Sequence, residues 1–298
     1  MIRPALLAAA ATLLFPAALI PTAASAHRMW MMPSTSIVSG DDTWVTVDAA
    51  VSNDLFYFEH QPLRVTPVVT EPDGAEGKAE NLSTGRYRTT FDVHITKKGT
   101  YRIAAVSDGV MGSYMLNGTE TRLPRGTTAA TLAAAIPAGA TDVKTSRNAS
   151  RNEIFVTSGA PTTTIFKPTG KGIELVPVTH PNDLVAGEKA TFKFLLDGKP
   201  AAGLPVTIIP GGIRYRDKLN QIDARTAADG SVSVTWPAAG MYWLNVTSGA
   251  TGEGMGGGGA PNAARPAGQG GERAPGAGPR PPMGDRVGYI TVLEVLAP

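Results

Sequence analysis

Histidine is the residue type whose positions in this sequence point most directly to chemistry. The chain has four histidines, His27, His60, His94 and His180, and no cysteine. Without thiolates, a transition metal would have to be held by nitrogen, oxygen or thioether ligands. Imidazole nitrogen suits ions such as copper and nickel, so the histidines are the first candidates for a metal site.

His27 is distinguished by what precedes it. Residues 24–26 read Ala-Ser-Ala, an A-x-A cleavage signal that closes an apolar leader. Cutting after Ala26 would make His27 the first residue, so its free α-amine and its imidazole could chelate one metal ion together. The reference pKa of such an amine is about 7.7–8.0, which lets a metal displace the proton near neutral pH. An internal histidine lacks this chelate because its nitrogen is an amide.

The leader itself predicts export. Arg3 gives it a positive start, and residues 5–20 are apolar but too short for a span of about 20 residues. We therefore predict a signal peptide over residues 1–26, a periplasmic mature protein and no transmembrane span in that mature chain. The formal net charge of +2 gives no argument for nucleic acid as a partner.

Two further histidines can complete a site around His27. His60 follows Glu59, a carboxylate that could orient an imidazole ring or act as a ligand. His94 and Asp92 are two residues apart on a predicted strand and so face the same side. Each has a simpler alternative, the edge of an aromatic cluster for His60 and an exposed strand face for His94. The predicted metal ligands are His27, His60 and His94, with nickel, cobalt or copper as the ion.

Other residues carry weaker signals. His180 lies in a Thr-His-Pro turn and is predicted to be structural. Met29, Met31 and Met32 could offer thioethers to Cu(I), but core packing is the preferred interpretation. No Gly-x-Ser-x-Gly elbow, His-Glu-x-x-His helix or phosphate loop occurs, so the chain is predicted not to be an enzyme.

The positioning elements are predicted to be strands. A first β-domain, residues 27–166, contains segments that alternate apolar and polar residues, the period of a half-buried strand. These segments are residues 43–49, 85–93 and 99–106, with residues 63–69 as an edge candidate because of Pro67. Residues 127–140 are Ala-rich and predict a short helix, and residues 141–146 are expected to form a loop or an exposed segment.

A second β-domain is predicted over residues 173–298, after a Gly/Pro linker at 167–172. Its short alternating strands are expected at 173–178, 189–196, 204–210, 231–236 and 240–246. Residues 249–284 are dominated by Gly, Pro and Ala and predict a disordered loop before a last strand at 287–296. The fold class is thus all-β, with two antiparallel Ig-like β-sandwich domains.

Several segments resemble one bacterial family. They are residues 26–30 with Pro33, residues 176–188, residues 196–206, residues 226–234 and residues 237–242. Together they are similar to the periplasmic NikM-like family of unknown function, associated with nickel uptake, and the resemblance spans nearly the whole mature chain. It implies a metal-associated periplasmic β-protein.

Three functions follow as hypotheses. The first is a non-enzymatic metal-binding or metal-uptake accessory protein that serves a metal transporter or an outer-membrane receptor. The second is a structural or adhesion-like Ig-type module without metal. The third is a copper oxidase that uses the N-terminal histidine as a brace for the ion.

Overall fold

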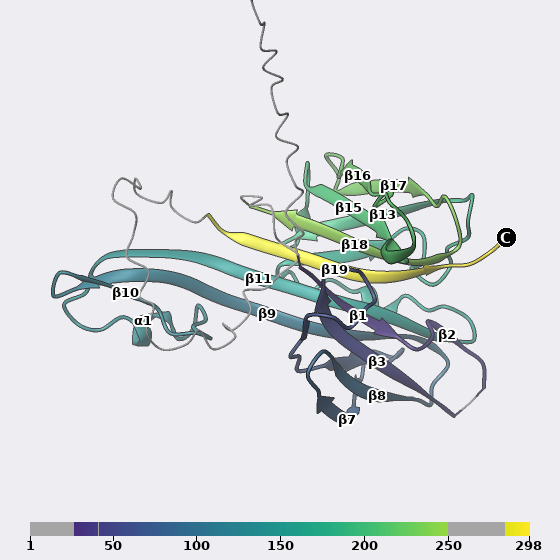
Figure 1. Cartoon of the computed structure of the whole chain (residues 1–298), viewed down its shortest axis with the longest axis horizontal. Helices are drawn as coiled ribbons and strands as arrows, with labels where there is room; N and C mark the ends of the chain where they lie inside the picture. The colour runs from purple at the N-terminus through teal and green to yellow at the C-terminus, as the bar shows by residue number, and fades with distance from the viewer. Residues whose placement is uncertain (1–26, 41, 250–283) are drawn as a thin grey trace, which may run out of the picture.

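A computed structural model of the chain describes residues 27–40, 42–249 and 284–298. The predicted signal peptide, 1–26, and nearly all of the predicted disordered loop, 249–284, lie outside the described residues. The described chain is all-β and is built from sandwiched, mostly antiparallel sheets, as the sequence predicts (Figure 1). No helix among the described residues is long and apolar enough to cross a membrane.

Three sheets form the structure within the described residues. A five-stranded sheet contains β1 (Arg28–Pro33), β3 (Thr43–Ser52), β4 (Gln61–Pro62), β7 (Ala79–Thr84) and β8 (Thr89–Ile95). A four-stranded sheet contains β12 (Ile173–Pro177), β13 (Lys189–Leu196), β14 (Lys199–Pro200) and β17 (Ser231–Thr235). Between them lies a ten-stranded central sheet.

The central sheet takes strands from both halves of the chain. From the first half come β2 (Ile37–Val38), β5 (Val68–Thr70), β6 (Glu76–Gly77), β9 (Gly99–Leu116), β10 (Thr119–Arg122) and β11 (Thr141–Ser158). From the second half come β15 (Pro205–Pro210), β16 (Ile222–Arg225), β18 (Gly240–Ser248) and β19 (Arg286–Val295). The halves join where β19 pairs parallel to β11, with Asn148 opposite Arg286.

Each face of the central sheet covers its own hydrophobic core, because successive side chains of a strand point to opposite faces. On β11, Ile154 packs in the core under the five-stranded sheet, and the next residue, Phe155, packs in the core under the four-stranded sheet. On β18, Trp243 and Leu244 divide in the same way. Strands from both predicted domains, 27–166 and 173–298, therefore belong to this one sheet. Residues 167–172 separate the two domains in the sequence only.

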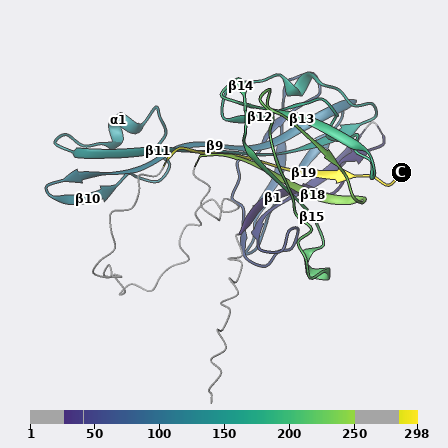
Figure 2. The same ribbon diagram turned by 90° about the horizontal axis from the view of Figure 1, so that it is seen from above.

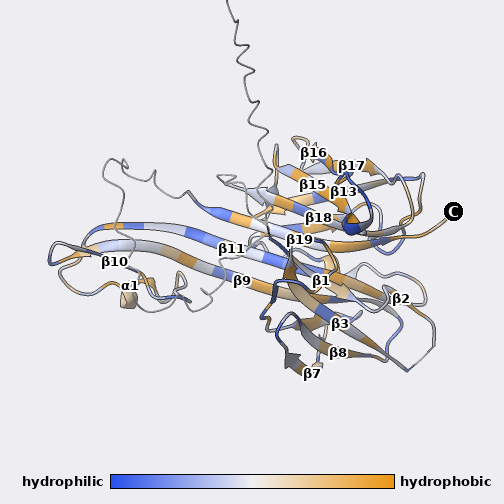
Figure 3. Cartoon of the chain, in the orientation of Figure 1, coloured by the Kyte–Doolittle hydropathy of each residue, from blue (hydrophilic) through white to orange (hydrophobic). Residues whose placement is uncertain are grey.

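The outer halves of β9 and β11 form a ribbon that projects beyond both sandwiches (Figure 2). Figure 3 shows few hydrophobic segments along it, in contrast to the alternating strands of the sandwiches. At the base of the ribbon, Arg147 donates to Asp108 at 3.0 and 3.1 Å and to Asp197 at 2.9 and 3.0 Å. The hydrogen bonds that Arg147 donates to Asp108 are the main reason that the pKa of Arg147 is raised above its usual value.

Three local predictions are corrected. Residues 141–146, expected to be a loop or an exposed segment, form the mostly exposed first part of the strand β11. The candidate strand at 63–69 is reduced to β5, which begins at Val68, directly after Pro67. The helix predicted over 127–140 is the single turn α1 (Leu132–Ala135), which ends before Pro137 because proline cannot supply the backbone donor a longer helix needs. Two short 3₁₀ turns complete the described elements, η1 (Thr164–Phe166) and η2 (Ile213–Tyr215).

Candidate functional site

Two of the predicted ligands flank the same end of one strand. β1 and β4 both pair with β3, where Arg28 lies opposite Ser52 and Gln61 lies opposite Val51. His27 directly precedes β1 and His60 directly precedes β4. The strand pairing therefore brings these two histidines, which are 33 residues apart in the sequence, together at the C-terminal end of β3.

The two rings contact each other. The ring centroids of His27 and His60 are 3.9 Å apart with an interplanar angle of 20°. His27 is half-buried and His60 is exposed, so a solute can approach the pair. Since imidazole lone pairs lie in the ring plane, binding one ion at about 2.0–2.1 Å requires both rings to turn from stacking until their nitrogens converge.

The loop that carries His60, residues 53–60, is anchored to the core at its start. Leu55 is fully buried, and Phe56 and Phe58 pack on Trp30 with ring centroids at 5.5 Å in each pair. The Trp30 indole donates to Ser52 Oγ at 2.8 Å, and that hydroxyl donates to the carbonyl of Asp54 at 2.7 Å. Buried Trp30, three residues after His27, thus fixes the loop relative to β1.

Glu59 closes the loop on itself. Its Oε1 accepts hydrogen bonds from the backbone N–H of Asn53 at 2.6 Å and of Asp54 at 3.2 Å. These bonds join the two ends of the loop immediately before His60. The carboxylate that the sequence offered as a partner for the His60 ring therefore has a defined role in shaping the loop backbone.

Phe56 adopts an unusual backbone conformation, with φ at +68°. Left-handed backbone is rare for bulky residues and costs on the order of 1–3 kcal/mol. Such strain persists only where surrounding contacts hold it, and it concentrates at functional sites. This feature of the His60 loop carries no signal in the sequence.

The charges around the pair are largely matched. Arg28 donates to the carbonyl of Asn53 at 3.0 Å; burial lowers the pKa of Arg28, and the nearby Asp54 carboxylate opposes that shift. Asp54 also pairs with Arg214 at 3.4 Å. The guanidinium of Arg214 stacks on the ring of Tyr57 at 3.8 Å.

The structure does not bring His94 to this pair. His94 lies opposite Trp44 at the other end of β3 and stacks on it with ring centroids 4.2 Å apart. It also contacts Asp42 Oδ1. At about 3.3 Å per residue, the eight residues from Trp44 to Ser52 separate His94 from the pair by about 26 Å. Across the described ranges, no three His, Cys, Asp or Glu side chains form a group that could hold a metal ion.

His180 has structural contacts. Its Nδ1 accepts from the backbone N–H of Asn182 at 3.1 Å, which leaves Nε2 as the protonated nitrogen of the neutral ring. Nε2 lies 3.0 Å from Thr100 Oγ1 and 3.3 Å from the carbonyl of Thr162. Burial lowers the pKa of His180 below its ordinary value.

The methionines near the N-terminus belong to the core. Met31 is fully buried among the residues under the five-stranded sheet, and Met29 and Met32 pack against the same core. A buried thioether at Met31 is placed to fill apolar space, as methionine commonly does.

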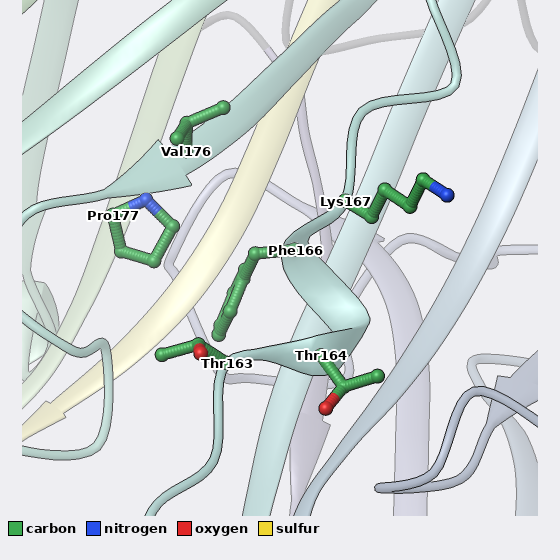
Figure 4. A pocket seen from close by; sticks show the side chains of 6 residues that line it. All are labelled: Thr163, Thr164, Phe166, Lys167, Val176 and Pro177. Carbon is green, nitrogen blue, oxygen red and sulfur yellow. The ribbon is translucent and has the colours of Figure 1, made fainter.

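A shallow hollow of about 430 Å³ lies elsewhere on the surface, beside η1 and β12. It is lined by Thr163, Thr164, Phe166, Lys167, Val176 and Pro177. Figure 4 shows the Phe166 ring turned toward Pro177, while Lys167 extends away from them. The hollow gathers no set of titratable or metal-binding groups, so the histidine pair is the stronger candidate site.

Comparison with known proteins places the chain in a family. The sandwiched sheets define an all-β protein with Ig-like architecture. The family model described as "Domain of unknown function (DUF4198)" matches residues 24–249, and the chain belongs to that family. No curated protein matches the sequence.

Solved structures give only distant likenesses. They include the D0-D1 domain of intimin, at 15% identity over 72% of this chain and 88% of that chain, with a TM-score of 0.18. The human OSCAR ligand-binding domain has 12% identity over 76% and 93%, with a TM-score of 0.18. The two tandem V-type regions of VCBP3, a v-region-containing chitin-binding protein, have 12% identity over 90% and 100%, with a TM-score of 0.21. At these TM-scores the likenesses carry no argument about function.

Proposed function

We propose that this protein is a non-enzymatic metal-binding protein of the periplasm, with His27 and His60 as the protein ligands of the ion. One observation carries the proposal: the ring of His60 stacks on the ring of the residue that a cut after Ala26 would make the first of the chain. The sequence offered one or both of His60 and His94 to complete the site. The stacking favours His60.

Cleavage would give the site three nitrogen donors. The α-amine and Nδ1 of His27 close a six-membered chelate ring with the ion, and the His60 imidazole supplies the third nitrogen. The amine is not a side chain, so this donor set does not require a third histidine or carboxylate nearby. Nitrogen donors of this kind suit nickel, cobalt and copper, and Cu²⁺ binds tightest in the general order of divalent ions.

The exposure of His60 fits delivery rather than storage. With three protein donors on one side, the remaining coordination positions face solvent, where an acceptor's ligands can replace water. The resemblance to the NikM-like family supports the same assignment, an accessory protein that passes metal to a transporter or an outer-membrane receptor.

Calorimetry on four protein forms tests the proposal. The reference is protein that begins at His27, titrated with Cu²⁺ and Ni²⁺. His60→Ala removes one direct ligand; because even outer partners of metal ligands are worth 10–100-fold in affinity, we expect a loss of about 100-fold, or about 2.7 kcal/mol. His94→Ala is the matched control and should bind as the reference does, since His94 lies at the far end of β3.

A form acetylated on the α-amine of His27 tests the amine. It keeps both imidazoles but turns the amine into an amide, so its affinity should also fall by at least tenfold. Reference protein that binds neither ion more tightly than about 1 mM, about −4 kcal/mol, would exclude the metal site and leave a structural or adhesion-like module.

The exposure of His60 beside His27 also favours a second candidate, a copper enzyme that oxidises a substrate at the same ion. The donor set of one amine and two imidazoles is the same in both proposals. Cleavage of a polysaccharide by the copper form in the presence of a reductant would support the enzyme. Tight copper binding without such cleavage supports the accessory protein.

A further inference from the structure

The loop that presents His60 is held from outside its own half of the chain. Residues 53–60 follow β3 in the first half, whereas Gly211 and η2 belong to the second half. Two kinds of contact join them, close packing at Phe56 and a stack of charged and aromatic groups at Tyr57. Neither contact was foreseen from the sequence.

The first contact depends on a missing side chain. A Cβ atom built on Gly211 would lie 2.9 Å from both Cδ2 and Cε2 of Phe56, closer than carbon atoms pack. Glycine at position 211 therefore lets the Phe56 ring lie against the backbone. On its other side the same ring meets Trp30 edge-on at 5.5 Å. Phe56, the half-buried residue with left-handed backbone, thus contacts both halves of the chain.

The second contact comes from η2 itself. The Arg214 guanidinium lies 3.8 Å from the centroid of the Tyr57 ring, and its Nε is 3.4 Å from Asp54 Oδ2. Tyr215 meets the Tyr57 ring at 6.2 Å in an edge-on arrangement, and its hydrogen bond with Tyr57 raises the pKa of Tyr57. The Arg214 side chain therefore contacts two residues of the loop, Asp54 and Tyr57, shortly before His60.

We propose that η2 is a positioning clamp for the metal site, in which Arg214 holds the loop of residues 53–60 so that His60 faces His27. This inference rests on the proposed function. The strained backbone at Phe56 would relax if the clamp opened, and His60, four residues later, would move with it. By linkage, an ion that fixes His60 must strengthen the docking of η2 to the same extent.

The test compares Arg214→Ala, Arg214→Lys and a control, Arg122→Ala, which alters an exposed arginine on β10 of the projecting ribbon. Amide hydrogen exchange of metal-free protein reports on the clamp alone. We expect exchange in residues 53–60 to speed by about tenfold in Arg214→Ala and to remain unchanged in Arg122→Ala. Lysine keeps the charge beside Asp54 but not the planar stack on Tyr57, so it should recover only part of the protection.

Copper binding reports on whether Arg214 positions His60 beside His27. In Arg214→Ala we expect Cu²⁺ affinity to fall about tenfold, and the electron paramagnetic resonance spectrum to show a fraction of copper that has lost one nitrogen ligand. A change in folding alone would lower the melting temperature without altering the nitrogen count of the bound ion.

Each failure has a separate meaning. Unchanged exchange in residues 53–60 overturns the clamp whether or not metal binds. Faster exchange with unchanged copper affinity and spectrum overturns the positioning of His60. Wild-type protein that binds no copper overturns the proposed function, while the exchange measurement still decides whether η2 holds the loop.

Discussion

Glu174 offers a sharp test of how residues 167–172 are fixed to the sandwich. This buried side chain, on β12, accepts three hydrogen bonds: from Thr169 N–H at 2.8 Å, from Thr169 Oγ1 at 2.6 Å and from Gly170 N–H at 2.7 Å. Arg151 lies 3.6 Å from the same carboxylate. Both oxygens accept hydrogen bonds, so the ionised form satisfies three donors of the exposed residues Thr169 and Gly170.

Glu174→Gln should destabilise the protein by about 2–4 kcal/mol at pH 7. Hydrogen bonds to a charged group contribute about 1.5–3 kcal/mol each, and neutral ones about 1 kcal/mol. Glutamine offers one carbonyl oxygen, so either Thr169 or Gly170 faces an amide donor. The lower cost of burying a neutral amide offsets part of this loss.

The effect should depend on pH with a definite sign. Burial raises the pKa of Glu174, but the hydrogen bonds from Thr169 and Gly170 outweigh it, so the pKa of the folded form is lowered. A lowered pKa stabilises the fold above the unfolded value, about 4.3, and that contribution is lost as pH falls through the folded pKa. The difference between wild type and Glu174→Gln should therefore shrink in acid.

Urea unfolding followed by tryptophan fluorescence measures this difference, since Trp30, Trp236 and Trp243 are buried in the folded protein. Glu80→Gln, on exposed β7, is the matched control and should change stability by less than about 0.5 kcal/mol. A loss below about 0.5 kcal/mol at pH 7 for Glu174→Gln, or a loss that stays constant into acid, would refute the reasoning.

Three further predictions concern glycines and acid. Gly230→Ala should lower the free energy of unfolding by about 3 kcal/mol or more. The reason is that φ at this position is +80° and the new Cβ would lie 2.3 Å from the Phe194 carbonyl oxygen. A smaller loss would mean that the turn can move to make room for the methyl group. Gly211→Ala should cost about 1–2 kcal/mol and weaken copper binding by displacing Phe56, and unchanged affinity would contradict that displacement. Bound copper should be released as pH falls from 7 to 5 in equilibrium dialysis, because the nitrogen donors must be unprotonated to bind; retention at pH 5 would argue for oxygen ligands.

The sandwich strands were predictable because their burial alternates. β3 and β8 carry apolar residues at every second position; β3 begins at Thr43 as predicted, whereas β8 begins at Thr89, four residues after the predicted start. The projecting ribbon was not predictable from that signal. Its strand segment over residues 141–147 is rich in Thr, Ser and charged residues and exposes most of them, so no face had to be apolar.

The candidate site was predictable only as a set of residue types. The predicted cleavage signal drew attention to His27, but nothing in the sequence distinguished His60 from His94. That distinction comes from strand register, since β1 and β4 meet the same end of β3 whereas His94 pairs with Trp44 at the other. The contacts of Arg214 with the loop join residues about 160 positions apart, a separation that local patterns do not encode.

The shared central sheet has a consequence for how the protein unfolds. Because neighbouring residues of β11 and β18 serve opposite cores, a fragment ending near residue 167 would lose Trp243 and Ile290 from the core it keeps. Neither half could be excised as an autonomous unit, and heat or denaturant should melt both together in a single cooperative transition. Insertions and exchanges during evolution would accordingly be tolerated in the connecting loops and ribbon, but not at the junction of the halves.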